Sequence, residues 1–446
     1  MALDSEFHRV SNLVLKHSKA DQTAAVFFQN DSALTRFANN IIHQNVQEHN
    51  SNLIVQAIIG KRSGVASTND LSEAAIRVAV ERAAAAARLL PENPDLPALS
   101  MPQLLGTSKS YVIKTVETGP DQRASAVSIV CSEAEEGKLV AAGTFSTGSY
   151  GVGYSNSNNN RGFYSTSLAE MSAVVQSPAG SGYADRLEID VSNIDAHAIA
   201  EEAIHRATVG SELLEVPPGK YEVVLEPYCV CDILDFFGFL SFGALAVQEE
   251  RSFMTGAIGK PVMGPKVTIW DDALDSRGIV TPFDLEGMPK RKVDLITDGI
   301  AKGYCYDLTT AAREGATSTG HGLPPGDSYW GPSPANMIMN PGSSTREEMI
   351  SHVERGLLVT RFWYTRPVHP LTVTITGVTR DGTFLIENGK IKGPVKNLRF
   401  TQSYLEAMNN VIEVSNKPRI VRTMFAANYV PALRIKDWNF TGVTQF

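Results

Sequence analysis

The sequence predicts an α+β protein of two domains, with β-strands plus helices in the N-terminal part and a mixed, strand-rich C-terminal part. In the first part, β-rich runs are followed by helical stretches more than once. In the second part, short strands separated by turn signals predominate. The stretch Pro217–Gly219 has two prolines and a glycine, which is typical of a boundary. We therefore expect domains at residues 1–216 and 217–446.

The length and composition agree with this organisation and exclude several classes of protein. A chain of 446 residues with 43% hydrophobic and 20% charged residues can bury a sizeable core. The net charge of −8 makes nucleic acid and anionic membrane poor partners. The N-terminus does not resemble a signal peptide, and no run of about 18 apolar residues occurs. With four dispersed cysteines and no CxxC pair, we expect a cytoplasmic protein.

Capping and stop residues delimit the helices expected in the N-terminal part. Asp70 is the expected N-cap of one helix, with Glu73 completing a capping box. Pro120 suits the first turn of another helix, and Gly137 suits its end. The expected helices span residues 5–17, 71–90, 120–136 and 195–208, and the β-like stretches span 24–65 and 138–175.

The longest apolar region of the chain follows a strand expected at 221–225. It begins near Tyr228 and contains Asp232 and Asp235. Two aspartates within so short an apolar run argue against a membrane span. We expect a buried helix at this position.

Two further local signals occur near the end of the chain. Ser344 and Glu347 have the spacing of a capping box, which predicts a helix over residues 344–355. Asn388 and Gly389 are typical of a two-residue turn between antiparallel strands. We expect a β-hairpin there.

No familiar catalytic or metal-binding motif is complete in this chain. None of the nine histidines forms an HExxH or HExxxH pair, and there is no GxSxG elbow. The stretch Gly256–Lys260 is followed by Pro261 and lacks the hydroxyl residue of a phosphate-binding loop. Cys229 and Cys231 are too close together for a usual zinc knuckle, so we expect two buried thiols.

Two segments are candidates for substrate binding. The glycine-rich loop 318–326 contains Gly320, which would let a ligand approach the backbone, and His321, which could hydrogen-bond it. A plain surface loop is the alternative. The strand from Arg361 to Arg366 has an arginine at each end and three consecutive aromatic residues between them, and could bind a carboxylate or stack on an aromatic group. The alternative for this segment is a half-buried strand with its arginines in solvent.

Several short motifs follow one another in order across the C-terminal part. They are Arg251–Phe253, Val267–Asp272, Phe283–Pro289, Leu295–Gly299, Ser318–Gly320, Gly356–Val359 and Ile386–Ile391. Together they cover about residues 220–400, and in this order and spacing they resemble the C-terminal domain of the TldD/PmbA (TldD/TldE) family. The resemblance implies that the C-terminal domain has the TldD/PmbA-type fold. The weaker pattern of the N-terminal part also fits this family.

In this family, the TldD-type subunit carries an HExxxH helix after the strand equivalent to Val223–Leu225, and a later cysteine completes its zinc site. Alignment on Gly238 places Leu234, Asp235 and Phe239 at the positions of that motif. Neither an alkyl group nor a phenyl ring can ligate zinc, and no cysteine follows Cys305. The chain therefore resembles the PmbA/TldE branch, which is understood as the non-metal partner of a TldD-type protease.

The resemblance implies a non-metal subunit that helps to close a chamber for unfolded or modified peptides. It implies no catalytic residue and no cofactor in this chain, with zinc held by a TldD-type partner. Two alternatives remain open: a subunit of a specialised biosynthetic hydrolase acting on a small peptide-like conjugate, and a homodimeric binding or regulatory module. The residues to suspect first in substrate binding are Gly320, His321, Arg361, Arg366, His369 and Arg380.

Overall fold

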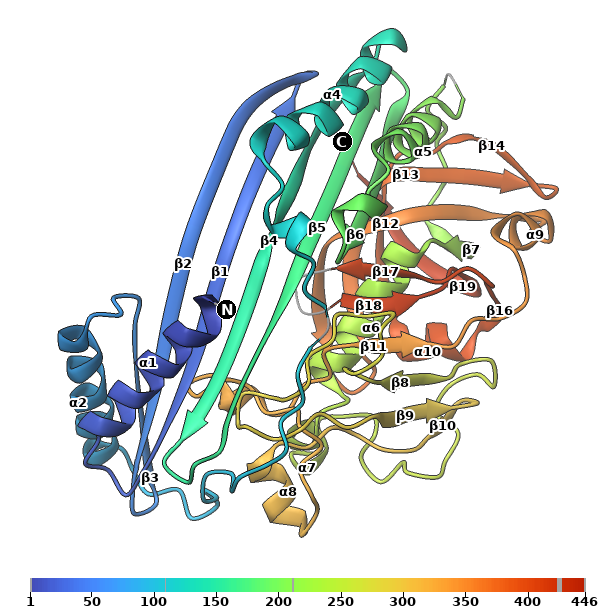
Figure 1. Cartoon of the computed structure of the whole chain (residues 1–446). Coiled ribbons are helices and arrows are strands. Elements are labelled where there is room, and N and C mark those ends of the chain that lie inside the picture. Colours follow the sequence, from blue (N-terminus) through green and yellow to red (C-terminus); the bar gives the residue numbers. More distant parts are fainter. Residues whose placement is uncertain (1, 109, 211, 423–426, 445–446) are drawn as a thin grey trace.

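The computed structural model describes residues 2–108, 110–210, 212–422 and 427–444. Its N-terminal part is built on a six-stranded antiparallel sheet with the order β3-β2-β1-β4-β5-β6. The long inner strands run diagonally through the left half of Figure 1. The strands are β1 (Gln22–Ala38), β2 (Ile41–Ile59), β3 (Arg62–Thr68), β4 (Val140–Asn156), β5 (Arg161–Ser177) and β6 (Gly180–Glu188).

Helices cover this sheet at its two ends (Figure 1). At one end, Phe7 of α1 and Ile76 of α2 pack on Phe27 and Leu53 of the sheet. At the other end, apolar residues of α4 and α5 pack around Phe37, Phe145 and Met171. The helices are α1 (Ala2–His17), α2 (Glu73–Leu89), α3 (Ile113–Val116), α4 (Pro120–Glu136) and α5 (Ala196–Thr208), with a short 3₁₀ turn η1 (Val191–Asn193).

These elements confirm the helices and β-like stretches expected in the N-terminal part, with one correction. Asp70 is not the N-cap of α2, and Glu73 is the first residue of the helix with its carboxylate paired to Lys16 and His17, so the expected capping box of Asp70 and Glu73 is wrong. The cap is Ser72, whose hydroxyl accepts the N–H of Ala75 at 3.3 Å, while Asp70 accepts the N–H of Ser72 at 2.9 Å. Both residues can cap a helix, and the aspartate is used in the turn that precedes it.

The C-terminal part contains two sheets. One has the order β10-β9-β8-β11-β18-β17, and the other has the order β12-β7-β19-β15-β13-β14. Because β12 also pairs with β13, the strands β12, β7, β19, β15 and β13 close into a ring. The first sheet contains β8 (Ile269–Asp271), β9 (Val293–Thr297), β10 (Ile300–Ala301), β11 (Met337–Met339), β17 (Arg419–Arg422) and β18 (Ala427–Val430). The second contains β7 (Gly219–Leu225), β12 (Arg355–His369), β13 (Thr374–Glu387), β14 (Lys390–Pro394), β15 (Leu398–Ser403) and β19 (Leu433–Val443), with β16 (Val411–Val414) paired to β19.

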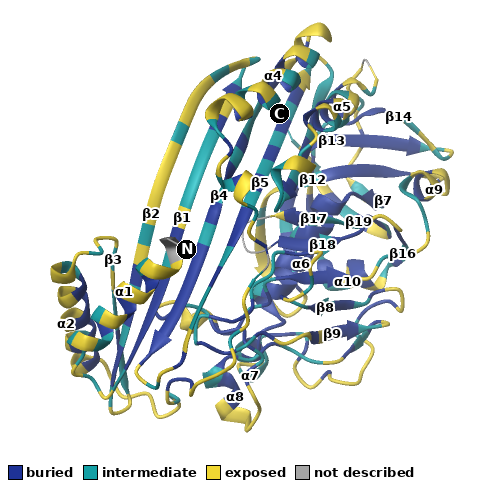
Figure 2. Ribbon diagram, in the orientation of Figure 1, coloured by how far each residue is buried: buried dark blue, intermediate teal, exposed yellow. Residues whose placement is uncertain are grey.

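The apolar helix α6 (Pro227–Leu240) lies at the centre of the C-terminal part (Figure 1). It contacts β7, β12, β17 and β18, and Figure 2 draws most of it as buried. This confirms the buried helix expected from the sequence. No helix among the described residues is long and apolar enough to cross a membrane. The remaining helices are α7 (Ala244–Gln248), α8 (Leu308–Glu314), α9 (Arg346–Ser351) and α10 (Tyr404–Asn409), with a 3₁₀ turn η2 (Ser328–Trp330).

The helix expected over 344–355 is shorter than predicted. Thr345 caps it rather than Ser344, and Glu348 completes the capping box by accepting the N–H of Thr345 at 2.7 Å. The helix stops early because β12 begins at Arg355 and Gly356–Val359 pair with β7. The expected hairpin at Asn388 is present, since this residue has a φ of 51° and joins β13 to β14.

Neutral contacts join the two parts at one place. The face of the N-terminal sheet that carries Val26 and Tyr164 packs on Phe283 of the C-terminal part. Ser100 donates a hydrogen bond to the carbonyl oxygen of Glu286 at 2.6 Å, and Asn160 donates one to that of Gly287 at 2.7 Å. A side chain on Gly287 would collide with the ring of Tyr154, which lies 2.2 Å from the position of a Cβ atom. The motif Phe283–Pro289 is therefore a docking turn.

Ion pairs join the two parts at a second place. Arg419 of β17 lies 2.5 Å from Asp185 of β6. The hydroxyl of Tyr228 on α6 accepts the N–H of Asp185 at 3.0 Å. A side chain from α6 thus satisfies a backbone group of the edge strand β6. The first sheet uses residues 22–188 and the other two use 219–443, while the domain boundary at 216 and 217 stays a prediction.

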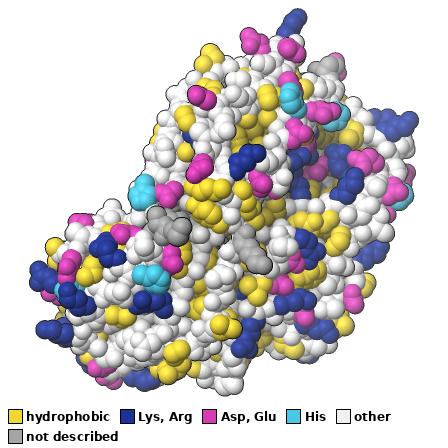
Figure 3. All heavy atoms as spheres, viewed as in Figure 1, with side chains coloured by type: hydrophobic (Ala, Val, Ile, Leu, Met, Phe, Trp, Pro, Cys, Tyr) yellow, Lys and Arg dark blue, Asp and Glu magenta, His cyan; other side chains and the backbone are white. Residues whose placement is uncertain are grey.

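Figure 3 shows lysine and arginine side chains interspersed with aspartate and glutamate on the face in view. No large basic area is visible on this face. The distribution agrees with the net charge of −8.

Candidate functional site

A pocket of about 360 Å³ lies where the N-terminal sheet, α6, β12 and β17 meet. We call it the cationic pocket. It brings together side chains that are far apart in the sequence. They are Tyr183 and Asp185 of β6, Tyr228 and Asp232 of α6, residues 361–366 of β12, and Val421 and Arg422 of β17.

Arg361 forms one wall of the cationic pocket and is fully partnered. Its guanidinium donates from Nε to Asp381 Oδ2 at 2.9 Å and makes a second contact with the same oxygen through Nη2. The guanidinium carbon also lies 4.0 Å from the ring centre of Tyr183. These contacts hold Arg361 in one place, so it positions the wall rather than reaching out to a ligand.

Trp363 and Tyr364 form the rim of the pocket and are 46% and 71% exposed. Arg380 lies over the Trp363 ring at 4.7 Å, and Arg366 lies over the Tyr364 ring at 4.4 Å. Among the described residues, Arg366 has no carboxylate partner and donates only to the carbonyl oxygen of Thr365. The rim therefore offers two aromatic faces and a cation that can take an anionic group.

The backbone of this rim departs from regular strand geometry. Tyr364 has a φ of 55°, a left-handed conformation that is uncommon for an aromatic residue. The register of β12 against β13 also shifts between Trp363 and Arg366. Beyond Val359, β12 pairs with β13 alone, so one edge of this segment has no strand partner within the described ranges. Strained backbone and a free strand edge are typical of binding sites.

Asp232 contributes one of the two carboxyl groups that line the pocket, and Asp185 contributes the other. Asp232 accepts hydrogen bonds from the hydroxyl of Tyr404 at 2.6 Å and from that of Thr365 at 2.8 Å. Burial raises the pKa of Asp232 to about 6, although the two hydrogen bonds act in the opposite direction. Its proton can therefore come and go near neutral pH.

The glycine-rich loop lies elsewhere and is buried. His321 is 1% exposed, and its Nε2 lies 2.8 Å from Asp271 Oδ2 while its Nδ1 lies 2.8 Å from the Thr319 hydroxyl. Gly320 has a φ of 76°, and a Cβ atom there would lie 2.4 Å from the carbonyl oxygen of Pro289. The glycine is thus needed for close packing of two backbone segments. The alternative of a plain surface loop is wrong for these two residues.

Burial and neighbouring groups together determine the protonation states of His321 and Asp271. Burial and the nearby Lys290 lower the pKa of His321, so the imidazole is neutral near pH 7. Burial would raise the pKa of Asp271, but the contact with His321, the Lys290 ammonium and the N–H of Asn336 hold it at about 2. An ionised Asp271 is therefore stabilised by hydrogen bonds and Lys290, with His321 as a neutral donor.

The structure separates the candidates that the sequence grouped. Arg361 and Arg366 line the cationic pocket, and Arg380 stacks on its rim. His369 is exposed further along β12, with Thr372 at 3.2 Å. His321 and Gly320 do not line this pocket. Their part in substrate binding stays a prediction.

Comparison with known proteins agrees with this fold. Residues 218–442 match the PmbA/TldA metallopeptidase C-terminal domain, and residues 24–87 match the PmbA/TldA metallopeptidase domain 1. The chain belongs to the PmbA/TldD metallopeptidase family. The family resemblance and the α+β fold expected from the sequence are both confirmed.

Relatives from both branches of the family are similar to this chain. A TldD metalloprotease homologue of Haemophilus influenzae is 30% identical over 240 residues, which is 52% of this chain and 48% of that protein. The chain thus spans about half the length of this relative. The metalloprotease PmbA of Escherichia coli O157:H7 is 26% identical over 384 residues, covering 80% of this chain and 78% of that one. The crystal structure of TldE from Thermococcus kodakarensis has a TM-score of 0.87 at 20% identity, covering 98% and 100%.

The three α6 positions assigned to the family's zinc motif do not offer a zinc-ligand set. Leu234 is 0% exposed within the apolar core. Asp235 accepts a hydrogen bond from Asn428 Nδ2 at 2.7 Å, and the Phe239 ring centre lies 5.4 Å from that of Trp330. Among the residues that the structure describes, no three His, Cys, Asp or Glu side chains gather where they could hold a metal ion. An alkyl group and a phenyl ring cannot ligate a zinc ion, so these three side chains do not form a zinc-ligand set.

The two cysteines of α6 are buried free thiols, as expected. Cys229 donates to the carbonyl oxygen of Val359 at 3.5 Å, and Cys231 to that of Val421 at 3.3 Å. Burial raises the pKa of each thiol well above its ordinary value. Both are therefore poor nucleophiles and poor metal ligands.

Sequence reasoning missed Asp232 as a site residue. In the sequence, the charge of this aspartate served only as an argument against a membrane-spanning helix. Tyr228 and Asp232 are four residues apart, which places them on one face of α6. This spacing could have predicted that the two side chains lie together. Tyr183 and Arg422 had none, because only the tertiary fold brings them to the pocket.

Proposed function

We propose that this chain is the non-metal subunit of a heteromeric TldD/TldE-type metallopeptidase that processes unfolded or modified peptides. The observation that carries the proposal is the environment of Leu234, Asp235 and Phe239 on α6. Their side chains are committed to the core, to Asn428 and to Trp330. A TldD-type partner would supply the zinc ion, which activates water for hydrolysis in metallopeptidases.

The cationic pocket supports a role in holding the substrate. Trp363 and Tyr364 offer exposed aromatic faces, and Arg366 offers a cation without a carboxylate partner among the described side chains. Unpaired backbone groups along β12 beyond Val359 can hydrogen-bond an extended peptide whatever its side chains. This chain therefore binds and orients the peptide, and hydrolysis takes place at the partner.

Co-expression with a TldD-type protein that carries HExxxH tests this proposal. We expect the two chains to co-elute from a size-exclusion column, and the complex alone to hydrolyse a reduced, unfolded protein such as casein. Replacing the motif glutamate of the partner by glutamine should preserve assembly and abolish hydrolysis. A stable homodimer that ignores the partner would contradict the proposal and favour a homodimeric binding module.

A pair of matched variants tests the part played by the pocket. Arg366→Gln should raise the KM of the complex for the unfolded substrate by about tenfold, the usual cost of one charge-assisted contact. Arg399→Gln removes an exposed arginine of β15 outside the pocket and should leave KM unchanged. Equal KM values for both variants would contradict substrate binding in the cationic pocket. They would not bear on assembly with the partner subunit.

The volume of the pocket favours one narrower function. About 360 Å³ lies within the usual size range of small-molecule sites, which fits a subunit of a biosynthetic hydrolase acting on a small peptide-like conjugate. A series of acylated peptides of increasing length separates the two functions. If the turnover rate falls steadily as the peptides lengthen, the result favours a hydrolase for small conjugates. If the rate rises with length, it favours a peptidase for unfolded peptides.

A further inference from the structure

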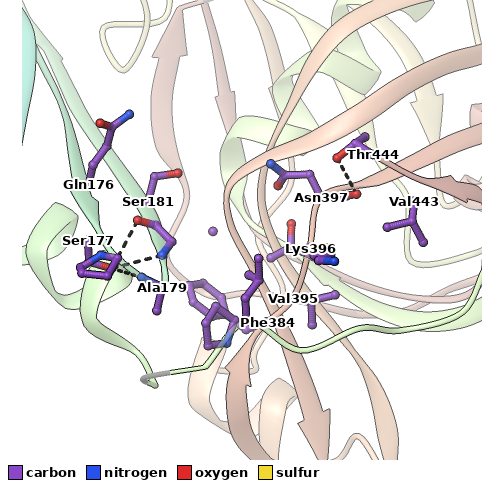
Figure 4. Close-up of a pocket in the computed structure, with 16 residues that line it drawn as sticks. Gln176, Ser177, Ala179, Ser181, Phe384, Val395, Lys396, Asn397, Val443 and Thr444 are labelled. Atoms are coloured by element: carbon purple, nitrogen blue, oxygen red, sulfur yellow. Dashed lines mark hydrogen bonds between the residues drawn. The ribbon is translucent and has the colours of Figure 1, made fainter. Parts of the chain in front are cut away.

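A second and larger pocket, of about 730 Å³, lies on the opposite side of Asp381 from the cationic pocket. Ser181 lines it and donates a hydrogen bond to Asp381 Oδ1 at 2.8 Å, while Arg361 of the cationic pocket donates to Oδ2. We call it the Lys396 pocket. Figure 4 shows the β5–β6 turn on its left, Asn397, Val443 and Thr444 on its right, and Lys396 between them.

The charge of the Lys396 pocket has one sign. Lys396 is its only cationic lining residue among those described, and no aspartate or glutamate lines it. The ammonium pairs with Glu215, which lies outside the lining and is 73% exposed. An exposed pair of this kind is weak and exchanges readily with solvent and ions. Lys396 is thus available to an anionic guest.

The rest of the lining combines apolar surface with a side-chain amide. Leu213, Phe384, Pro394 and Val443 supply apolar area. Gln176 brings a side-chain amide, which can donate to an oxygen.

Thr383 adds a polar group to the same wall. Its buried hydroxyl has no hydrogen-bond partner within the described part of the chain. Rotation about χ1 exchanges the hydroxyl of a threonine with its methyl group, so a ligand oxygen could satisfy it.

We propose that the Lys396 pocket binds a carboxylate that carries an apolar body, such as the C-terminal residue of a peptide. The carboxylate pairs with the Lys396 ammonium and accepts a hydrogen bond from the Gln176 amide. The apolar body packs on Phe384 and Pro394. Nothing in this inference requires the partner subunit, so it stands or falls apart from the proposed function.

Binding of N-acetyl-leucine and of its neutral analogue N-acetyl-leucinamide to the full chain tests the proposal by NMR titration. The two probes have the same apolar body and differ in charge. We expect the acid to bind about tenfold more tightly, since a charge-assisted hydrogen bond is roughly twice as strong as a neutral one. Equal affinities for the two probes would overturn the proposal. So would no detectable binding of the acid at about 20 mM, roughly the weakest dissociation constant expected for so small a ligand.

Three variants locate the bound acid. Lys396→Gln should make the two probes bind alike, whereas Lys392→Gln, an exposed lysine of β14 outside the lining, should change nothing. Glu215→Gln should tighten binding of the acid about twofold, because it removes the competing carboxylate. Ala179→Trp should fill the pocket and abolish binding of both probes.

Folding is checked separately from binding in these variants. Among the described residues, no side chain donates a hydrogen bond to Ala179, and its N–H can still donate to Ser177 after the substitution. The melting temperature of the Ala179→Trp variant should therefore stay near that of the wild type. If Lys396→Gln keeps the preference for the acid while remaining folded, the carboxylate is bound elsewhere and the proposal is wrong.

Discussion

The loop of His321 and the rim of Arg366 have similar chemistry and opposite surroundings. Each combines a glycine or strained residue with a basic side chain. His321 is buried with both ring nitrogens partnered, whereas Arg366 lies beside exposed aromatic rings without a carboxylate partner among the described residues. Access to solvent, rather than residue type, therefore distinguishes a buried structural scaffold from a binding surface. Substitutions in the first region should therefore reduce stability, and substitutions in the second should reduce binding.

The largest expected effect is at His321. His321→Ala leaves a buried, ionised Asp271 without one of its donors and should lower the free energy of unfolding by about 3 kcal/mol. His369→Ala, at an exposed position of β12, should change it by less than about 0.5 kcal/mol. Urea denaturation measures both. Equal changes in the free energy of unfolding for the two variants would contradict the comparison, because His321 would then not be part of the scaffold.

Gly320→Ala should come next, at about 2–3 kcal/mol, because it combines a left-handed backbone with a collision. A Cβ atom there would lie 2.4 Å from the Pro289 carbonyl oxygen. Gly256 has a φ of 62° and no atom of the described residues within 4 Å of the same position, so Gly256→Ala should cost only about 1 kcal/mol. Thermal unfolding of the pair isolates the collision. If the two variants lose equal stability, the backbone approach at Gly320 is unimportant.

Asp232 should make stability depend on pH, by an amount on the order of 2 kcal/mol. The pKa in the folded chain, about 6, lies above the ordinary value of 3.8. Its contribution is therefore present below about pH 4 and is lost as the pH rises through 6. Asp232→Asn should remove this part of the slope and be more stable than the wild type at pH 7, while Asp437→Asn, at an exposed position, should not. A variant that is less stable at pH 7 and keeps the full slope would contradict the prediction.

Only a small effect on stability is expected at Trp363. Trp363→Ala removes a half-exposed ring from the rim and should change the free energy of unfolding by about 0.5 kcal/mol. It should nevertheless weaken binding of an unfolded peptide, measured by fluorescence anisotropy. Loss of about 3 kcal/mol of stability would instead place Trp363 in the scaffold beside His321.

Local signals predicted much of the fold. Pro120 and Glu136 bound α4 as expected, and Asn388 forms the turn between β13 and β14. The errors came where neighbouring residues compete for one role, as Asp70 and Ser72 do before α2 and Ser344 and Thr345 do before α9. Local chemistry favours either member of such a pair, and only the packed structure decides between them.

The candidate site was only partly predictable. The composition of residues 361–366 predicted the rim, because three consecutive aromatic residues lie between two arginines there. Pairing of β12 with β7 and β13 could not be read from the sequence, since it joins segments more than 100 residues apart in one case. Burial of His321 was equally hidden, because a loop has no periodicity from which to infer its buried face.

We propose that this chain binds no metal of its own and works beside a zinc-binding subunit. Metal analysis of the purified full chain, alone and in complex with a TldD-type partner, tests it most directly. We predict no stoichiometric zinc in the chain alone, and zinc in the complex that disappears when the partner's motif histidines are replaced. Stoichiometric zinc in the chain alone, accompanied by peptidase activity, would contradict the account.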